Sequence, residues 1–326
     1  MHLLDVMARE GFEELIALHD RRSGLRGLLA IHDTSRGPAF GGIRRLAYRD
    51  ESQAMADALR LARAMSYKCA LMDLQAGGGK LVLFDRSDTD WRAAYEYIGD
   101  VLERLGGRFY TGPDMGTGAT ELAWTASRTS YVTDPGADGP GELAESTAEG
   151  VFRGMAVALQ HLDGEPDWQA RTVVVQGLGS VGALLARRLV GQGAKVLGAD
   201  IDDERAQSVA EDLGIELLEP SRAIGAPCDV YAPCALGGIL HDLTLGRLRC
   251  RVVAGGANNV LARTAHGDHL HEQGILYVPD SLLNCGALIR GTIFHLEGRR
   301  EPVPTIGERV GKVVARILQR AESEDA

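Results

Sequence analysis

The sequence predicts an α/β protein of two domains, the second of which is built on a doubly wound parallel sheet. From Arg171 onward, short apolar runs that suit strands alternate with longer runs that suit helices: RTVVVQG, GSVGALLARRLVGQG and AKVLGAD. Such alternation is typical of a parallel sheet covered by helices on both faces. The stretch 134–141 (DPGADGPG) is dense in Gly and Pro and resembles a linker. A chain of 326 residues is also long for a single hydrophobic core.

The first half of the chain is predicted to mix helices and strands. Apolar residues at helical spacing predict a helix over 11–19, and GLLAIH at 27–32 predicts a buried strand. Residues 36–42 (RGPAFGG) are expected to form a loop. Ser52 is a suitable N-cap for a long helix that continues to about Tyr67. The remaining expected elements are strands at 81–84, 229–232, 252–255 and 275–278, and helices at 91–105, 145–162 and 308–320.

These elements divide into two expected domains. Residues 1–145 form the first, which is expected to bind substrate, and the C-terminal segment 287–326 is expected to pack back on it. Residues 146–286 form the second. The active site is expected where the two domains face each other.

Composition narrows the classes of function. Hydrophobic residues make up 45% of the chain, and no apolar run approaches the roughly 18 to 20 residues that span a bilayer. The net charge of -10 argues against a nucleic-acid-binding surface. The N-terminus lacks a signal-peptide pattern, so a cytoplasmic location is expected. The five cysteines are scattered and form no C-x-x-C pair, which favours reduced thiols and predicts no metal site.

A glycine-rich motif in the second half predicts a dinucleotide-binding, Rossmann-type domain. Gly177-Leu178-Gly179-Ser180-Val181-Gly182 matches G-x-G-x-x-G, follows an apolar strand and opens an apolar helix. Gly177 would make the tight turn, Gly179 would let a pyrophosphate approach the backbone, and Gly182 would let helix and strand pack closely. The unpaired N–H groups of the helix would then face the phosphates.

The acidic residue after the next strand favours NAD over NADP as the cofactor. Asp200 ends AKVLGAD and is followed by Ile201, with no Arg in the run that comes directly after. A carboxylate there can accept hydrogen bonds from the ribose hydroxyls, and it would repel a 2′-phosphate.

Three charged residues in the first half are candidates for catalysis. Lys68 closes a predicted helix, Lys80 follows three consecutive glycines, and Asp114 follows Gly112-Pro113 in a glycine-rich loop. Each of them alone would more often be a solvated loop charge. Glycines remove side-chain bulk, however, so a ligand could lie against the backbone beside these groups. The three together, ahead of a dinucleotide domain, predict an active site.

The motifs of the whole chain resemble one family. GPAFGG (37–42), MSYK with GGGK 12 residues on, TGPDMGT, VVVQGLGSVG, DVYAPCALGG, AGGANN and ILYVPD occur in that order. They resemble the leucine, valine and phenylalanine dehydrogenases, one branch of the glutamate dehydrogenase superfamily. The resemblance implies oxidative deamination of an L-amino acid to a 2-oxo acid and ammonia as NAD is reduced, and the reverse reductive amination.

The resemblance also implies roles for individual residues. Lys68 would bind the substrate carboxylate, Lys80 would be the general acid/base, and Asp114 would assist proton transfer. A second lysine and partial desolvation would lower the pKa of Lys80, as a base near neutral pH requires. Asn258 or Asn259 would hydrogen-bond near the nicotinamide and the substrate. Further residues implied at the substrate are Phe40, Gly41, Gly42, Leu288 and Gly291, and further residues implied at the cofactor are Ser180, Val181, Ile201, Cys234 and Ala235.

Several positions depart from the family pattern. Asp73 stands where the family has glycine, and it either faces the substrate pocket or is a solvated loop acid, the second being favoured. Cys285, Ala287 and Arg290 are changes in the helix that lines the side-chain pocket of relatives. A larger Phe40 and the small Gly291 predict a reshaped pocket for an apolar, aromatic or unusual amino acid. A homo-oligomer is expected by family analogy, and the short tail suggests a dimer.

Two other functions remain open at this stage. The scaffold could serve an NAD-dependent oxidoreductase that acts on an unusual amine or hydroxy acid, although retention of Lys68 argues against it. It could also be a non-catalytic NAD-binding paralogue, although Lys80 and Asp114 beside an intact nucleotide motif argue against that.

Overall fold

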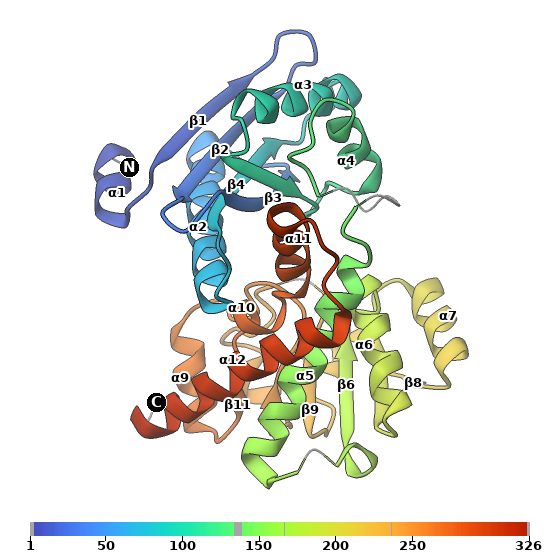
Figure 1. Ribbon diagram of the computed structural model, residues 1–326. Coiled ribbons are helices and arrows are strands. Elements are labelled where there is room, and N and C mark those ends of the chain that lie inside the picture. The colour runs from blue at the N-terminus through green and yellow to red at the C-terminus, as the bar shows by residue number, and fades with distance from the viewer. Residues whose placement is uncertain (1–2, 134–138, 166, 236, 325–326) are drawn as a thin grey trace. The chain divides into compact units, whose positions relative to one another are not determined.

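The computed structural model describes residues 3–133, 139–165, 167–235 and 237–324, and it divides into two compact units (Figure 1). The first unit comprises residues 1–141 and 288–300, and the second comprises 142–287 and 301–326. The division therefore falls a few residues before the expected boundary at 145. Most of the predicted linker, at 134–138, lies outside the described residues.

Among its described residues, the first unit holds a five-stranded sheet in the order β1-β2-β4-β3-β5. β1 pairs antiparallel with β2 and β2 with β4, whereas β3 pairs parallel with both β4 and β5. The strands are β1 (Glu14–His19), β2 (Arg26–Asp33), β3 (Ala39–Leu46), β4 (Gly77–Phe84) and β5 (Phe109–Gly112), and the helices are α1 (Leu3–Glu10), α2 (Glu51–Leu71), α3 (Trp91–Arg104) and α4 (Ala119–Ala126).

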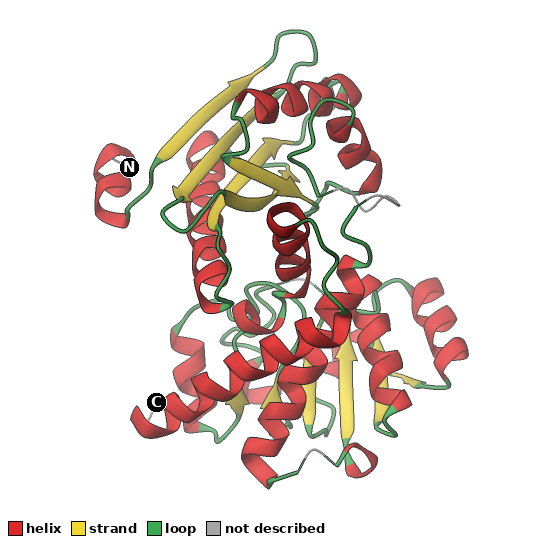
Figure 2. Ribbon diagram, viewed as in Figure 1, coloured by secondary structure: helices red, strands yellow, loops and turns green. Residues whose placement is uncertain are grey.

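Helices cover both faces of this sheet, as the secondary-structure colouring also shows (Figure 2). α2 packs on one face, where Val82 of β4 meets Ala58 and Ala62 in one buried cluster. α3 covers the other face, where Leu81 of β4 packs with Ile98. Because side chains alternate along a strand, even-numbered positions of β4 face α2 and odd-numbered ones face α3.

The helix predicted over 11–19 is wrong, because this segment contains β1. Its residues pair with β2 in an unbroken register from Glu14–Ile31 to His19–Arg26. Leu15 packs into the cluster on the α2 face, and Leu18 packs into the cluster on the α3 face. Both faces of this partly buried edge strand contact apolar clusters, so its apolar residues do not alternate strictly and their pattern resembled a helix.

The ends of two neighbouring elements also differ from the sequence prediction. The loop predicted over 36–42 is wrong in part, since β3 begins at Ala39. The long helix α2 is capped by Asp50, whose carboxylate accepts a hydrogen bond from the N–H of Gln53, and Ser52 lies inside the helix. α2 continues to Leu71, which places Lys68 in its last turn.

The second unit has the predicted doubly wound parallel sheet, and its described strands run in the order β11-β10-β9-β6-β7-β8 with every pairing parallel. The strands are β6 (Thr172–Gln176), β7 (Lys195–Ala199), β8 (Glu216–Leu217), β9 (Val230–Pro233), β10 (Val252–Val253) and β11 (Leu276–Tyr277). The helices between and around them are α5 (Leu143–Asp163), α6 (Ser180–Gly191), α7 (Asp203–Leu213), α8 (Pro220–Ala223), α9 (Ala265–Glu272) and α10 (Asp280–Leu283).

The C-terminal segment divides between the two units. α11 (Gly286–Glu297) lies mainly in the first unit, as the sequence predicted. The prediction is wrong for α12 (Val303–Glu324), which belongs to the second unit and packs along α5 (Figure 1). Gly150 of α5 leaves room for Val310, because a Cβ at Gly150 would lie only 3.2 Å from a methyl group of Val310. None of the helices that the structure describes is long and apolar enough to cross a membrane.

Candidate active site

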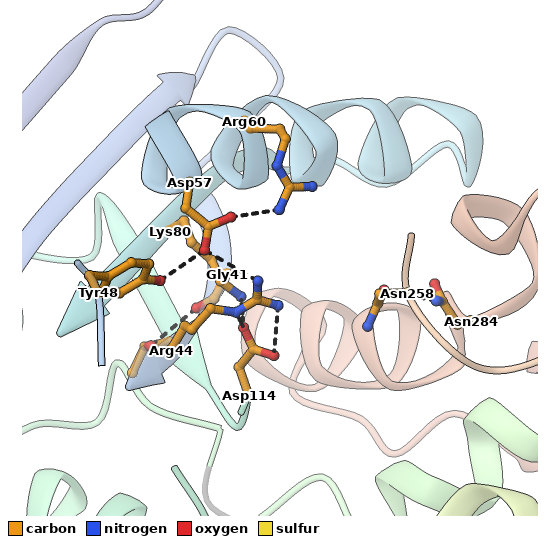
Figure 3. Close-up of polar contacts among 10 residues, drawn as sticks. Gly41, Arg44, Tyr48, Asp57, Arg60, Lys80, Asp114, Asn258 and Asn284 are labelled. Carbon is orange, nitrogen blue, oxygen red and sulfur yellow. Dashed lines mark hydrogen bonds and ion pairs between the residues drawn. The ribbon is translucent and has the colours of Figure 1, made fainter. Parts of the chain in front are cut away.

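Lys80 and Asp114 form a buried ion pair on the α2 face of the first unit (Figure 3). Nζ of Lys80 lies 2.6 Å from Oδ2 of Asp114, and the two side chains are 7% and 13% exposed. Lys80 follows the three glycines inside β4, so the strand fixes its direction toward α2. Asp114 lies just beyond β5 in a tight turn, where the N–H of Thr117 donates to the carbonyl of Asp114. The structure thus brings into direct contact two of the three residues that the sequence predicted for an active site.

Arg44 of β3 joins this pair and was not anticipated from the sequence. Its Nε donates to Oδ2 of Asp114 at 2.9 Å and its Nη2 to Oδ1 at 3.4 Å. Arg44 pairs with Val82 in the β3–β4 register, two residues beyond Lys80, and so lies on the same face of the sheet. Asp114 therefore contacts two cations at once.

A second carboxylate supports Arg44 from α2. Nη1 of Arg44 lies 3.3 Å from Oδ2 of Asp57, which also accepts a hydrogen bond from the hydroxyl of Tyr48 at 2.8 Å. The other oxygen of Asp57 accepts from Arg60 (Figure 3). The result is a continuous polar network from Tyr48 through Asp57, Arg44 and Asp114 to Lys80.

Burial and neighbouring charges shift the pKa values of the pair. Burial would raise the pKa of Asp114, but the positive charges of Lys80 and Arg44 outweigh it and hold the pKa at about 2. Burial lowers the pKa of Lys80, and the charges of Arg44 and Lys68 act in the same direction, while Asp114 opposes them. Asp114 is therefore an anion at neutral pH, and Lys80 loses its proton more easily than an exposed lysine.

Lys68 lies in the last turn of α2, half-buried, with its charge close enough to lower the pKa of Lys80. Asp73 lies just after this helix and takes a positive φ of 49°. Its side chain is 88% exposed and pairs with Arg36, so it is the solvated loop acid that the sequence favoured.

The glycines of β3 and β4 serve close packing of the protein. A Cβ at Gly41 would lie 1.8 Å from the carbonyl oxygen of Gly79, and one at Gly78 would lie 2.1 Å from the backbone of α2. At Gly42 a Cβ would approach Pro113 and the Cβ of Asp114. The sequence interpretation, room for a ligand beside Gly77, Gly78 and Gly79, is wrong for the side-chain positions of these glycines, which protein atoms occupy.

The segment predicted to line the side-chain pocket contains an aromatic cluster. The ring of Phe40 stacks on Tyr110 of β5 at 4.9 Å between centroids, and the ring of His295 lies 4.8 Å from that of Tyr110. His295 of α11 also contacts the hydroxyl of Thr133 through Nε2, at 3.1 Å. Burial lowers the pKa of His295 to about 4, so the imidazole is neutral at pH 7.

Gly291, Thr292 and the half-buried Leu288 lie at helical spacing on the α11 stripe that contains His295. A Cβ at Gly291 would lie 3.4 Å from Thr133, which is ordinary contact. The hydroxyl of Thr292 is buried and has no hydrogen-bond partner among the described residues. Arg290, in contrast, donates from Nε to the carbonyl of Pro140 at 2.6 Å and so binds a neighbouring loop.

The loop before α6 fits a dinucleotide pyrophosphate. Gly177 takes a φ of 102°, and a Cβ at Gly182 would lie 1.8 Å from the carbonyl oxygen of Gly177, so both positions require glycine. A Cβ at Gly179 would meet no atom within 4 Å, and Ser180 is exposed at the first turn of the helix. Gly179 is the N-cap of α6 and offers no side-chain cap, which leaves the N–H groups of Ser180 and Val181 available to phosphate oxygens.

Asp200 lies just past β7, where the sequence predicted a ribose-binding carboxylate. It accepts hydrogen bonds from the N–H of Leu178 at 2.7 Å and from Nη2 of Arg205 at 2.9 Å. The arginine is close in space although no Arg follows Asp200 directly in sequence. Ile201 is 85% exposed beside it. A carboxylate and an exposed apolar side chain at this edge suit the ribose and the base of an adenosine.

The predicted asparagine lies at the end of the segment after β10. Asn258 is exposed, and its Oδ1 accepts a hydrogen bond from Nδ2 of Asn284 at 2.8 Å (Figure 3). Asn259 takes a positive φ of 53°, and its N–H donates to Asp280. Asn258, one of the two asparagines named from the sequence, is therefore oriented by a second amide.

Two cysteines near the predicted cofactor and substrate motifs, Cys234 and Cys285, are packing residues. Burial raises the pKa of Cys234 to about 11, and the thiol of Cys285 donates to the carbonyl of Ser281 at 2.9 Å. Cys234 lies next to the exposed Ala235, and a Cβ at Gly177 would come within 2.8 Å of Ala235. Cys234 therefore lacks the lowered pKa that a nucleophile needs.

Sequence reasoning missed five residues at these sites: Arg44, Asp57, Tyr48, His295 and Arg205. Arg44 follows Gly41-Gly42 by two residues, and the alternation of a strand would have put it on the face of Phe40 and Gly42, had 39–46 been recognised as a strand. Its partner Asp57 comes from a different element, and nothing local indicates the pairing.

Comparison with known proteins agrees with this arrangement. Residues 14–131 match the family model described as the Glu/Leu/Phe/Val dehydrogenase dimerisation domain, and residues 200–293 match the glutamate/leucine/phenylalanine/valine dehydrogenase model. Leucine dehydrogenase from Bacillus subtilis is 40% identical over 296 residues, which cover 89% of this chain and 80% of that one. Phenylalanine dehydrogenase from Thermoactinomyces intermedius is 37% identical, with coverage of 99% and 90%.

A solved structure gives the same result in three dimensions. L-tryptophan dehydrogenase from Nostoc punctiforme superimposes with a TM-score of 0.83 at 32% identity, covering 99% of this chain and 94% of that one. The chain therefore belongs to the Glu/Leu/Phe/Val dehydrogenase family and is an amino-acid dehydrogenase.

Proposed function

We propose that this amino-acid dehydrogenase uses NAD to deaminate an L-amino acid with an apolar or aromatic side chain, with Lys80 and Asp114 as its catalytic pair. The observation that carries the assignment of these residues is the buried 2.6 Å contact between Nζ of Lys80 and Asp114, beside Arg44. The products are the 2-oxo acid and ammonia, and the reverse reaction aminates the 2-oxo acid. Relatives named leucine, phenylalanine and tryptophan dehydrogenase support this substrate class.

The proposed chemistry requires a base at neutral pH. A bound nicotinamide would supply the hydride acceptor for the substrate α-carbon, and the oxidised substrate would then carry an iminium group for water to attack. Neutral Lys80 removes a proton from the water that attacks this carbon, and the lowered pKa of the lysine makes its neutral form accessible. Asp114 stabilises the ammonium that Lys80 then carries. Lys80 returns the proton to the amine of the carbinolamine and then takes the hydroxyl proton as ammonia leaves and the carbonyl forms. Release of that proton to solvent returns Lys80 to its neutral form.

Lys68 is the proposed partner of the substrate carboxylate. An ammonium in the last turn of a helix, half-buried and facing the Lys80 charge, is a suitable point charge for an α-carboxylate. The carboxylate would offset the two neighbouring lysine charges when it binds. Phe40, Leu288 and Gly291 are the proposed lining of the side-chain pocket, with Gly41 and Gly42 beside the α-carbon and Asn258 beside the nicotinamide.

NAD is the proposed cofactor because Asp200 would meet the adenosine ribose. Burial would raise the pKa of Asp200, but hydrogen bonds from Arg205, Asp202 and Leu178 lower it, so the group is a carboxylate at neutral pH. A carboxylate binds the 2′-hydroxyl and repels a 2′-phosphate. Arg205 already pairs with Asp200 and offsets part of that repulsion. The preference for NAD over NADP is therefore smaller than an unpaired carboxylate would give.

The test is NADH formation with each proteinogenic L-amino acid, run on the wild type and on Lys80→Ala. Lys195→Ala is the matched control, since Lys195 lies exposed on the second unit. We expect activity with a few apolar or aromatic amino acids, about 10³-fold lower in Lys80→Ala and unchanged in the control. Full activity in Lys80→Ala would contradict the role of Lys80 as the base. No NADH formation with any of the amino acids tested would contradict the proposed substrate class.

We also propose that the protein is a homo-oligomer. The family model that matches 14–131 is described as a dimerisation domain. β1 is also the edge strand in the described order of the sheet, next to β2. A dimer is our first expectation. Sedimentation equilibrium of the full chain would show the mass of two or more copies, and a monomer at micromolar concentration would contradict the proposal.

A further inference from the structure

Arg44 is the part of the polar network that neither the sequence motifs nor the proposed roles explain. Its side chain is 8% exposed and lies between two carboxylates, Asp114 and Asp57. Oδ2 of Asp114 is shared, because Nε of Arg44 lies 2.9 Å from it and Nζ of Lys80 lies 2.6 Å from it. Nη2 of Arg44 reaches the other oxygen of Asp114 at 3.4 Å. The guanidinium thus contacts both oxygens and limits rotation of the carboxylate.

Arg44 is itself held in place from α2. Oδ2 of Asp57 accepts from Nη1 of Arg44, and the same oxygen accepts from the hydroxyl of Tyr48 at 2.8 Å. Asp57 is 15% exposed, and its pKa is lowered, since hydrogen bonds from Tyr48 and Arg60 and the charge of Arg44 outweigh burial. The anion that orients Arg44 is therefore present throughout the neutral range.

The charge balance shows what Arg44 adds to the reaction. An isolated Lys80–Asp114 pair would keep the proton on Lys80, because loss of that proton would leave a buried carboxylate without a counter-charge. Arg44 cannot lose its proton near neutral pH. With Arg44 present, Asp114 stays paired when Lys80 is neutral. The titratable and charged groups that face this pair are Arg44 from β3 and Lys68 and Asp57 from α2.

We propose that Arg44 is a positioning residue of the deamination reaction: it holds Asp114 in the orientation that contacts Lys80 and balances the carboxylate when Lys80 gives up its proton. This inference rests on the catalytic roles proposed for Lys80 and Asp114. If Arg44 had only a structural role, its substitution would lower the stability of the fold and leave the pH profile of the reaction unchanged. A positioning Arg44 also predicts a changed pH profile.

The test compares Arg44→Met, Arg44→Lys and the wild type by the pH profile of kcat/KM for deamination. Loss of the Arg44 charge favours the protonated form of Lys80, so the acidic limb of Arg44→Met moves to higher pH, by about one unit. We expect kcat to fall about 100-fold in this variant at neutral pH. KM for the amino acid should stay within about threefold, because Lys68 is unchanged.

Arg44→Lys keeps the charge and removes the two-point contact. Its acidic limb should move less than that of Arg44→Met, while kcat should still fall about tenfold. This variant decides the question if Arg44→Met does not fold. Arg45→Met is the matched control from the next position of β3, since Arg45 faces Trp91, Asp85 and Glu121 on the opposite side. It should lower the melting temperature and leave the acidic limb in place.

Asp114→Asn separates this inference from the proposed function. If Asp114→Asn is almost inactive while folded Arg44 variants keep the wild-type kcat and acidic limb, the positioning role is overturned and the catalytic pair stands. If Asp114→Asn keeps full activity, the catalytic role proposed for Asp114 is wrong, and the positioning role proposed for Arg44 is then also wrong. A shifted limb in Arg44→Met, with an unshifted limb in Arg45→Met, supports the inference.

Discussion

The ammonium of Lys80 lies 2.6 Å from Oδ2 of Asp114, and both side chains are nearly excluded from solvent. A buried charge pair loses much of its hydration on folding, so it is retained at a cost that a structural role alone seldom explains. Here the pair lies among further charges that shift both pKa values downward.

Asp114 should stabilise the fold in a pH-dependent way. Its pKa falls from an ordinary value near 3.8 to about 2 in the folded protein, so the ionised group favours folding at pH above 4. This contribution, about 2 kcal/mol, should disappear as the pH falls from 4 toward 2. Urea unfolding of the wild type and Asp114→Asn from pH 7 to pH 2 measures it. A stability difference that stays constant over this range would contradict the prediction.

Lys68→Ala should weaken substrate binding more than it slows chemistry. Loss of a charge-assisted contact to the substrate carboxylate raises KM for the amino acid by about 10- to 100-fold, with a smaller change in kcat. Steady-state kinetics with saturating NAD provides the measurement, and Lys195→Ala again serves as the control. An unchanged KM would mean that Lys68 does not bind the carboxylate.

Asp200→Ser should relax the cofactor preference. The substitution removes the carboxylate that pairs with Arg205 and leaves that guanidinium, at 44% exposure, able to meet a 2′-phosphate. We expect Kd for NAD to rise about tenfold and Kd for NADP to fall. Both constants are measured by protein fluorescence without turnover. If Asp200→Ser with Arg205→Ala binds NADP as well as Asp200→Ser alone, Arg205 is not the phosphate contact.

Gly291→Val should narrow the side-chain pocket. A Cβ is tolerated, since it would lie 3.4 Å from Thr133, but the two further methyl groups of valine extend beyond it. The ratio of kcat/KM for phenylalanine to that for valine should fall about tenfold or more. Ile289→Val, in the buried interior of the same helix, should lower stability and leave the ratio unchanged. An unchanged ratio in Gly291→Val would place the pocket elsewhere.

The sequence by itself determined the features that depend on neighbouring residues. The turn at Gly177, the approach at Gly182 and the carboxylate at Asp200 follow from steric and electrostatic requirements within one strand-turn-helix unit. The parallel sheet of the second unit followed from the same local alternation of apolar runs. Lys68, Lys80 and Asp114 were identified because glycines and a recognisable order of motifs surround them.

Only the tertiary structure decided the contacts between distant segments. Arg44 and Asp114 are 70 positions apart, and neither sequence pattern indicates that the other is its partner. β1 became a strand because β2 pairs with it and apolar clusters on both faces of the sheet contact it, although its own apolar spacing also suits a helix. α12 packs on α5 with Val310 close against Gly150, where a Cβ would lie 3.2 Å from the valine methyl group. Local periodicity fixes which face of an element is apolar, whereas the choice of partner depends on packing and charge balance over the whole domain.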